Sequence, residues 1–145
     1  MSLLIGLKNT ATQAVATGGS VSLNTTYRKY CKKVCAVSTF GFTSTSVTLQ
    51  QPGVYHVTAT LVGSGDAAGD VTIQLTEDTI PVTFSTQTIT TPTTELRTFV
   101  LDYYILVDNS TVLNSNVVNT KSISLVNAGV DATFTNVIMN IEKVV

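Results

Sequence analysis

Strict alternation of apolar and polar residues is the feature that most constrains the fold of this chain. In the segment DVTIQLTED, Val71, Ile73 and Leu75 alternate with threonine and glutamine. Because successive side chains of a strand point to opposite faces, this pattern predicts a strand with one face in the core and the other toward solvent. No segment long enough for a helix carries apolar residues at helical spacing. The alternation therefore predicts an all-β fold.

The composition and the turn signals agree with this prediction. The 145 residues include 26 Thr and 20 Val, which are β-branched and favour strands. Pro52-Gly53 is a strong turn signal, and similar stretches recur at 17–20, 63–70, 90–95, 107–120 and 127–129. This spacing is typical of a sandwich or jelly roll, and the length corresponds to one domain.

Two segments carry large apolar residues on both of their faces. In 98–107, Phe99, Leu101 and Ile105 alternate with Val100 and Tyr104, and 131–145 shows the same property. In a two-sheet sandwich, one face of each strand meets the core and the other meets water. The second apolar face therefore predicts an oligomer, in which another copy of the chain covers it.

Candidate catalytic groups are sparse. His56 is the sole histidine, with no sequence neighbour that would pair with it as a nucleophile, so we expect a packed or interface histidine and no catalytic residue. Phosphate-binding, zinc-protease and hydrolase motifs are missing from the sequence, and we expect no enzyme and no cofactor. The net charge of −1 gives no footprint for nucleic acid or an anionic membrane surface.

Two possible metal sites and one basic segment leave alternatives open. The acids in GSGDAAGD, residues 63–70, either bind calcium or belong to a plain strand connection. Cys31 and Cys35 would lie roughly 13 Å apart on a strand, which is too far for a disulfide. A zinc site would need two further ligands, and the sequence has none at a suitable spacing. We therefore expect reduced structural cysteines and no metal site. The basic stretch YRKYCKKV either contacts an anionic group or, more commonly, forms a solvated strand edge.

The N-terminal residues MSLLIGL form an apolar run that ends at Lys8. The run is too short for a secretory signal, which predicts synthesis in a cytoplasm, and no stretch reaches the roughly 20 apolar residues of a membrane span. We predict two units, a segment 1–7 and a domain 8–145. The segment is expected to attach the protein to a larger assembly through Leu3, Leu4, Ile5 and Leu7.

A succession of motifs resembles a known family. The stretches ATQAVATGGS, SVTLQQPGVYHVTATL, DVTIQLTEDTIPV and SISLVNAGVDATFTNVIMNIEKV are similar in order and spacing to the tumour-necrosis-factor-like and complement-head-like jelly rolls of bacteria and phages. The resemblance covers about residues 8–145. It implies a two-sheet antiparallel jelly roll of about ten strands that assembles as a homotrimer and is not an enzyme.

The resemblance also implies which face is turned toward the three-fold axis. The predicted interface consists of Val54, His56, Thr58, Tyr104, Phe134 and Ile138. Tyr55, Val57, Ala59 and Leu61 alternate with the first of these and are assigned to the core. One departure from the family is Asp78-Thr79, where relatives commonly have Asn-Gly, and it predicts a longer or different hairpin turn.

Our leading hypothesis is a structural virion protein of a bacteriophage, made in the host cytoplasm, that serves as a trimeric capsid decoration or head-fibre protein. Its partners would be the capsid or other virion proteins, with no nucleic acid and no membrane. A second hypothesis is a receptor- or glycan-binding module at a fibre tip, which would contact a host surface glycan. A third is a bacterial surface or spore-coat protein.

Overall fold

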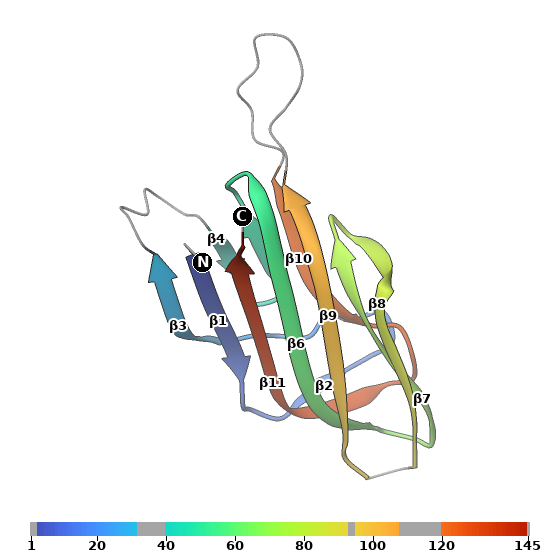
Figure 1. Cartoon of the computed structure of the whole chain (residues 1–145). Helices are drawn as coiled ribbons and strands as arrows, with labels where there is room; N and C mark the ends of the chain where they lie inside the picture. Colours follow the sequence, from blue (N-terminus) through green and yellow to red (C-terminus); the bar gives the residue numbers. More distant parts are fainter. Residues whose placement is uncertain (1–2, 32–39, 93–94, 108–119, 145) are drawn as a thin grey trace.

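Two antiparallel β-sheets packed face to face form the protein (Figure 1). The computed structural model describes residues 3–31, 40–92, 95–107 and 120–144. The larger sheet has the order β3-β1-β11-β6-β9, with β2 paired to β11, and the smaller has the order β4-β5-β10-β7-β8. This confirms the predicted all-β jelly roll. The strands are β1 Leu3–Asn9, β2 Gln13–Val15, β3 Thr25–Cys31, β4 Phe40–Thr43, β5 Ser46–Leu49, β6 Gly53–Gly65, β7 Gly69–Glu77, β8 Ile80–Thr91, β9 Arg97–Val107, β10 Lys121–Asn127 and β11 Ala132–Lys143.

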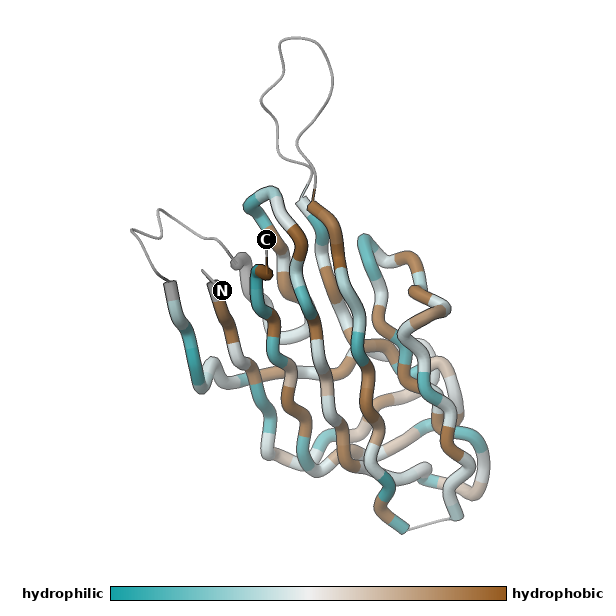
Figure 2. Tube along the Cα trace, in the orientation of Figure 1, coloured by the Kyte–Doolittle hydropathy of each residue, from teal (hydrophilic) through white to brown (hydrophobic). Residues whose placement is uncertain are grey.

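The core lies between the sheets and is built by the alternation seen in the sequence. Hydrophobic and hydrophilic residues alternate along the strands (Figure 2). On β6, the side chains assigned to the core are at most 2% exposed: Tyr55, Val57, Ala59 and Leu61. The apolar residues of β7 are likewise buried: Val71, Ile73 and Leu75. These two predictions of core residues are confirmed.

Strand β9 carries apolar side chains on both faces, as the sequence predicted. Phe99 and Ile105 point into the core and are at most 1% exposed. On the opposite face, Val100 is 57%, Tyr104 58% and Leu106 54% exposed. The outward side of this strand therefore carries three exposed apolar side chains, Val100, Tyr104 and Leu106, with the carboxylate of Asp102 between the first two. We call these three side chains the β9 stripe.

Strand β11 contains a bulge that overturns one prediction. Phe134 pairs with Gly63 and Asn136 pairs with Val62, so Thr135 is an extra residue in β11. This extra residue reverses the side of the sheet to which the side chains before it point. Phe134, predicted on the interface face, is therefore fully buried and meets Phe99 edge to face, with ring centroids 6.1 Å apart. A Cβ on Gly63 would lie 2.5 Å from the Phe134 ring, so this close approach requires glycine.

The hairpin between β7 and β8 corrects a second prediction. Glu77 pairs with Ile80, which leaves a two-residue loop of Asp78 and Thr79, with φ of 51° and 69°. Positive φ at both central residues defines a type I′ turn, so the turn is of the family's usual type without Asn-Gly. Asp78 fixes it to β10, because its carboxylate accepts from the Ser122 amide at 2.8 Å while its own amide donates to the Ser122 carbonyl.

The predicted boundary after residue 7 falls inside strand β1, and this prediction is corrected. β1 lies between β3 and β11 in the larger sheet, with Leu4 paired to Glu142 and Lys8 to Ile138. Ile5 is 3% and Leu7 0% exposed, so both belong to the core. These two side chains hold the fold together and are not free to attach the protein to a partner.

Candidate functional site: the outward face of the larger sheet

The outward face of the larger sheet brings together five of the six predicted interface residues. The pairing register places Leu4, Glu142, His56 and Tyr104 in one row across four strands, because each is directly opposite the next. Neighbouring rows on the same face contain the other residues of the prediction: Val54, Thr58 and Ile138. The sixth, Phe134, points to the opposite side. Leu4, predicted to attach the protein, also lies on this face, and the side chain of Leu3 lies outside the described set.

His56 occupies the middle of this face, between two carboxylates. Its Nε2 lies 2.6 Å from Oδ1 of Asp102 on β9, and its Nδ1 lies 3.3 Å from Oε1 of Glu142 on β11. The imidazole stacks on Tyr104, with ring centroids 4.5 Å apart and planes 10° from parallel. Burial alone would lower the pKa of His56, but hydrogen bonds and charge attraction from Asp102 and Glu142 outweigh it, and the pKa is raised.

Tyr27, on the edge strand β3, lies over part of the same face. The Tyr27 hydroxyl donates to the side-chain oxygen of Asn140 across strand β1. Its ring lies over Gly6, where a Cβ would come within 2.7 Å of the ring, so only glycine leaves room for it. Tyr27 remains 40% and Tyr30 50% exposed. The face therefore has aromatic groups near both of its lateral edges.

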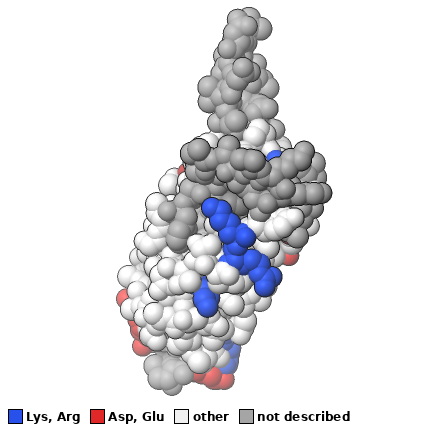
Figure 3. Space-filling model, turned by 90° about the vertical axis from the view of Figure 1, so that its left-hand side faces the viewer, with Lys and Arg blue, Asp and Glu red and all other residues white. Residues whose placement is uncertain are grey.

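The edge strand β3 carries the basic residues. Arg28 and Lys29 are exposed, and Figure 3 shows Lys and Arg side chains gathered on this side of the molecule. The position of β3 at the end of the sheet order confirms that Tyr27 to Cys31 form a strand edge. Cations on an edge oppose the addition of a foreign strand. Residues 32–34 of the basic stretch lie outside the described part of the chain, as does Cys35.

The acidic segment 63–70 is engaged with threonines. Asp66 accepts from the Thr133 hydroxyl at 2.6 Å, and Asp70 accepts from the Thr90 hydroxyl. Within residues 3–31, 40–92, 95–107 and 120–144, no group of three or more His, Cys, Asp or Glu side chains is placed to hold a metal ion. The same part of the chain contains no helix of the length and apolarity that a membrane crossing requires.

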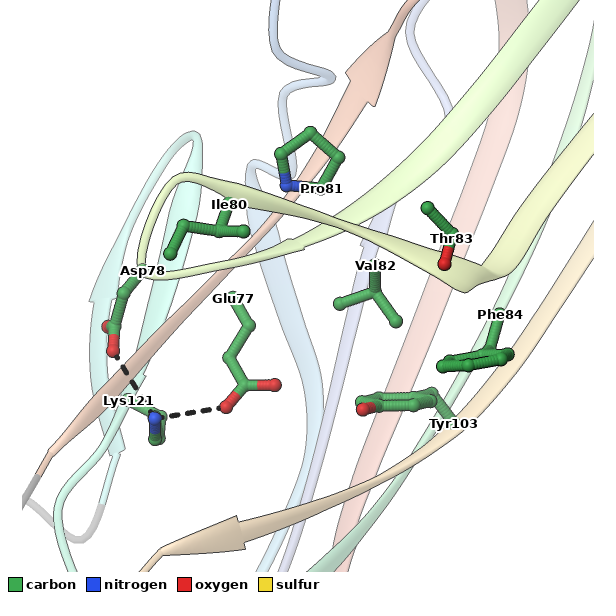
Figure 4. A pocket seen from close by; sticks show the side chains of 9 residues that line it. All are labelled: Glu77, Asp78, Ile80, Pro81, Val82, Thr83, Phe84, Tyr103 and Lys121. Atoms are coloured by element: carbon green, nitrogen blue, oxygen red, sulfur yellow. Dashed lines mark ion pairs between the residues drawn. The ribbon is translucent and has the colours of Figure 1, made fainter.

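A pocket of about 290 Å³ between β8, β9 and β10 was not foreseen from the sequence (Figure 4). One end is aromatic, with Phe84 and Tyr103, and the other holds Lys121, whose Nζ lies 3.1 Å from Oε1 of Glu77.

The pocket lies where the pairing of β7 with β8 is irregular, because the four residues 82–85 of β8 are opposite the single residue Leu75 of β7. The side chains of β8 therefore do not alternate regularly between its two faces there. The sequence gives no signal of this pocket, because Ile80, Val82 and Phe84 alternate regularly with polar residues and proline, whereas the structure buries Val82 and leaves Phe84 exposed.

Solved structures with the same fold were found, whereas no family model and no curated protein matches the chain. The globular domain of zebrafish complement 1qA is 12% identical, with a TM-score of 0.57, and the match covers 99% of this chain and 98% of that one. Murine APRIL at pH 5.0 is 7% identical, with a TM-score of 0.67 and coverage of 98% and 99%. The vertex protein P5 of PRD1 is 15% identical, with a TM-score of 0.59 and coverage of 100% and 74%. The chain thus has the jelly-roll fold of tumour-necrosis-factor-like and complement-head-like domains.

Proposed function

We propose that this protein is a non-enzymatic structural protein of a bacteriophage virion, a capsid decoration or head-fibre protein that works as a homotrimer. The outward face of the larger sheet would surround the three-fold axis. The observation that carries the trimer is the β9 stripe, whose three apolar side chains are each more than half exposed. β9 is the last strand in the order of the larger sheet, and a cluster of exposed apolar side chains there marks an interaction surface.

The magnitude of this burial shows how much of the face must take part. Fully burying a large apolar side chain contributes about 1.5–3 kcal/mol relative to leaving it exposed, so covering each half-exposed side chain of the stripe contributes roughly 1 kcal/mol. Association costs at least about 4 kcal/mol in lost freedom of motion. The stripe alone is therefore too small, and the interface must include the neighbouring Val54, His56, Thr58 and Ile138.

The virion assignment has different support. The likeness to the vertex protein P5 of PRD1 extends over the whole of this chain. The surface is poor in charge, since only 12% of the residues are charged, and is rich in threonine. We infer that the partners are the capsid or other virion proteins, and that the protein resides in the virion.

Light scattering coupled to gel filtration tests the trimer. The expected mass is three times the 15.4 kDa of one chain. Tyr104→Asp places a charge on the stripe and should give monomers. Thr88→Asp is the matched control, because Thr88 is also an exposed strand residue but lies on the outward face of the smaller sheet, opposite Thr72. A wild-type protein that is monomeric at micromolar concentration would refute the trimer.

Protein composition of purified particles tests the virion assignment. Phage particles from a producing culture would be banded on a density gradient and analysed by mass spectrometry. The chain should co-purify with the particles in a fixed ratio to the major capsid protein. Its presence in the lysate but not in the band would contradict the proposal, and binding on a glycan array would then favour the receptor-binding hypothesis.

A further inference from the structure

The face that would surround the three-fold axis carries a cluster of titratable side chains, and what we infer from this cluster rests on the proposed function. The cluster consists of His56 on β6, Asp102 on β9 and Glu142 on β11. β6 lies between the other two strands, so the imidazole has a carboxylate on each side (Figure 1). The side chains of the three residues are 21%, 61% and 33% exposed, so in a single copy each is still partly hydrated.

We propose that protonation of His56 strengthens the trimer, so that the protein assembles more tightly in mildly acidic than in mildly alkaline solution. Both ring nitrogens face a carboxylate oxygen, with Nε2 2.6 Å from Asp102 and Nδ1 3.3 Å from Glu142. A neutral imidazole carries one N–H and donates to one of these oxygens, whereas the imidazolium carries two and donates to both. In the neutral ring, the lone pair of the other nitrogen would face a carboxylate. The geometry of the cluster is therefore that of the protonated ring.

The aromatic neighbour of His56 also favours the protonated ring. The imidazole lies over the ring of Tyr104, with centroids 4.5 Å apart and planes 10° from parallel. Because the face of an aromatic ring is electronegative, it attracts a cation that lies on it. Burial alone lowers the pKa of His56, but the hydrogen bonds and charges of the two carboxylates outweigh burial and raise it.

The two carboxylates of the cluster have no other cation beside them among the described residues. Their ion pairs in this part of the chain are with His56. The register places Lys8 of β1 and Arg28 of β3 on the same face, but one and two strands separate them from β6. Lys143 follows Glu142 in β11 and pairs with a core residue of β6, so it belongs to the other side of the sheet. The cluster therefore has a net charge of −2 with a neutral imidazole and −1 with a protonated one.

Assembly makes the protonation state of His56 more important. In a single copy, water hydrates the carboxylate to which a neutral ring cannot donate. Another copy that covers the face removes this water, and a three-fold axis brings the carboxylates of three copies toward one another. A buried charge without a partner is costly, so the trimer should hold the proton of His56 more tightly than the monomer does. Protonation and assembly then favour each other by the same free energy.

The direction of the pH dependence follows from the two pKa values of His56. The pKa of the folded monomer is already raised above 6.5, and that of the trimer should be higher still. The contribution of His56 to assembly is then fully present below the pKa of the monomer and is lost as the pH rises through the pKa of the trimer. Each unit by which assembly raises the pKa changes the trimerisation constant by about tenfold per copy, or about 1,000-fold for three copies.

Sedimentation equilibrium of dilution series at about pH 6 and about pH 9, on either side of the expected transition, tests the inference. The wild-type trimer should dissociate at lower protein concentration in the acidic series than in the alkaline one. His56→Gln should dissociate at the same concentration in both series, because an amide does not titrate in this range. The double variant Asp102→Asn, Glu142→Gln should reverse the dependence, because a protonated ring would then be buried without a compensating charge.

An NMR titration gives a second and direct measurement. His56 is the sole histidine, so one ring resonance reports its pKa. The pKa should be higher in a concentrated sample, where the trimer dominates, than in a dilute sample, where the monomer dominates. Equal values in the two samples would contradict the inference.

The failure of this inference can be told apart from the failure of the trimer. A wild-type protein that is monomeric in both series would overturn the trimer and the inference with it. A trimer with the same dissociation in both series, or a pH dependence that persists in His56→Gln, would overturn only the role of His56. If His56→Gln does not fold, as judged by circular dichroism, the NMR titration of the wild type decides the question without it.

Discussion

The hairpin turn at Asp78-Thr79 predicts that the same chemical change has opposite effects at two positions. Thr79 is a β-branched residue held at φ 69°, in the left-handed region that non-glycine residues rarely adopt. Such a conformation costs on the order of 1–3 kcal/mol, and glycine relieves it. Glycine also gives the unfolded chain more freedom, which costs roughly 0.5–1 kcal/mol. Thr79→Gly should therefore stabilise the protein by about 1 kcal/mol, or about 4 °C in melting temperature for a domain of this size.

Thr48 is the matched control for this prediction. It lies in strand β5, between the buried Val47 and Leu49, where the backbone is extended and glycine offers no relief. Thr48→Gly should lower the melting temperature by a few degrees, because a strand loses about 1 kcal/mol when threonine becomes glycine. Both variants would be melted at one protomer concentration, since assembly makes stability depend on concentration. A destabilising Thr79→Gly would show that the turn is not of type I′.

Three further predictions follow from individual side chains. In urea unfolding of the Tyr104→Asp variant, which should be monomeric, Phe134→Ala should cost about 3–5 kcal/mol because the ring is buried, whereas Ile138→Ala on the outward face should cost far less. The pKa of His56 is raised in the folded state, so its contribution to stability is fully present below the unfolded pKa of about 6.5 and is lost as the pH rises through the folded pKa. The variant His56→Gln should remove this pH dependence of stability. An NMR titration that places the pKa of folded His56 at or below 6.5 would contradict the prediction. Burial raises the pKa of Tyr55 to about 12, so stability should fall as the pH rises from 10 toward 12, and Tyr55→Phe should flatten that alkaline decline in a denaturation series.

The core of the fold could be predicted because regular alternation fixes which side chains point inward. Tyr55 and Ile73 are examples, since each lies in an uninterrupted strand with a clean period of two. Phe134 was misplaced because a bulge adds one residue without a sequence signature, and this reverses the direction of every side chain on one side of it.

The candidate site was predictable in part for the same reason. His56 and Tyr104 lie on strands with regular pairing, so their shared face followed from the pattern. Their stacking and the approach of Glu142 depend on the register between strands far apart in sequence, which one strand's pattern does not specify. Ile5 and Leu7 were expected to face a partner because a short apolar segment before Lys8 has no long alternation to reveal a strand in the sheet.

The place of β1 between β3 and β11 has a consequence for how the chain acquires its structure. β11 begins at Ala132, and its residues 137–143 are the hydrogen-bonding partners of residues 3–9. While a ribosome still holds the last of these residues, the larger sheet has no strand to join β1 to β6. Each nascent chain must therefore wait, with Ile5 and Leu7 uncovered, until residue 143 has emerged. Because contacts so distant in sequence form slowly, the interval before residues 137–143 pair with residues 3–9 is when this protein is most exposed to aggregation.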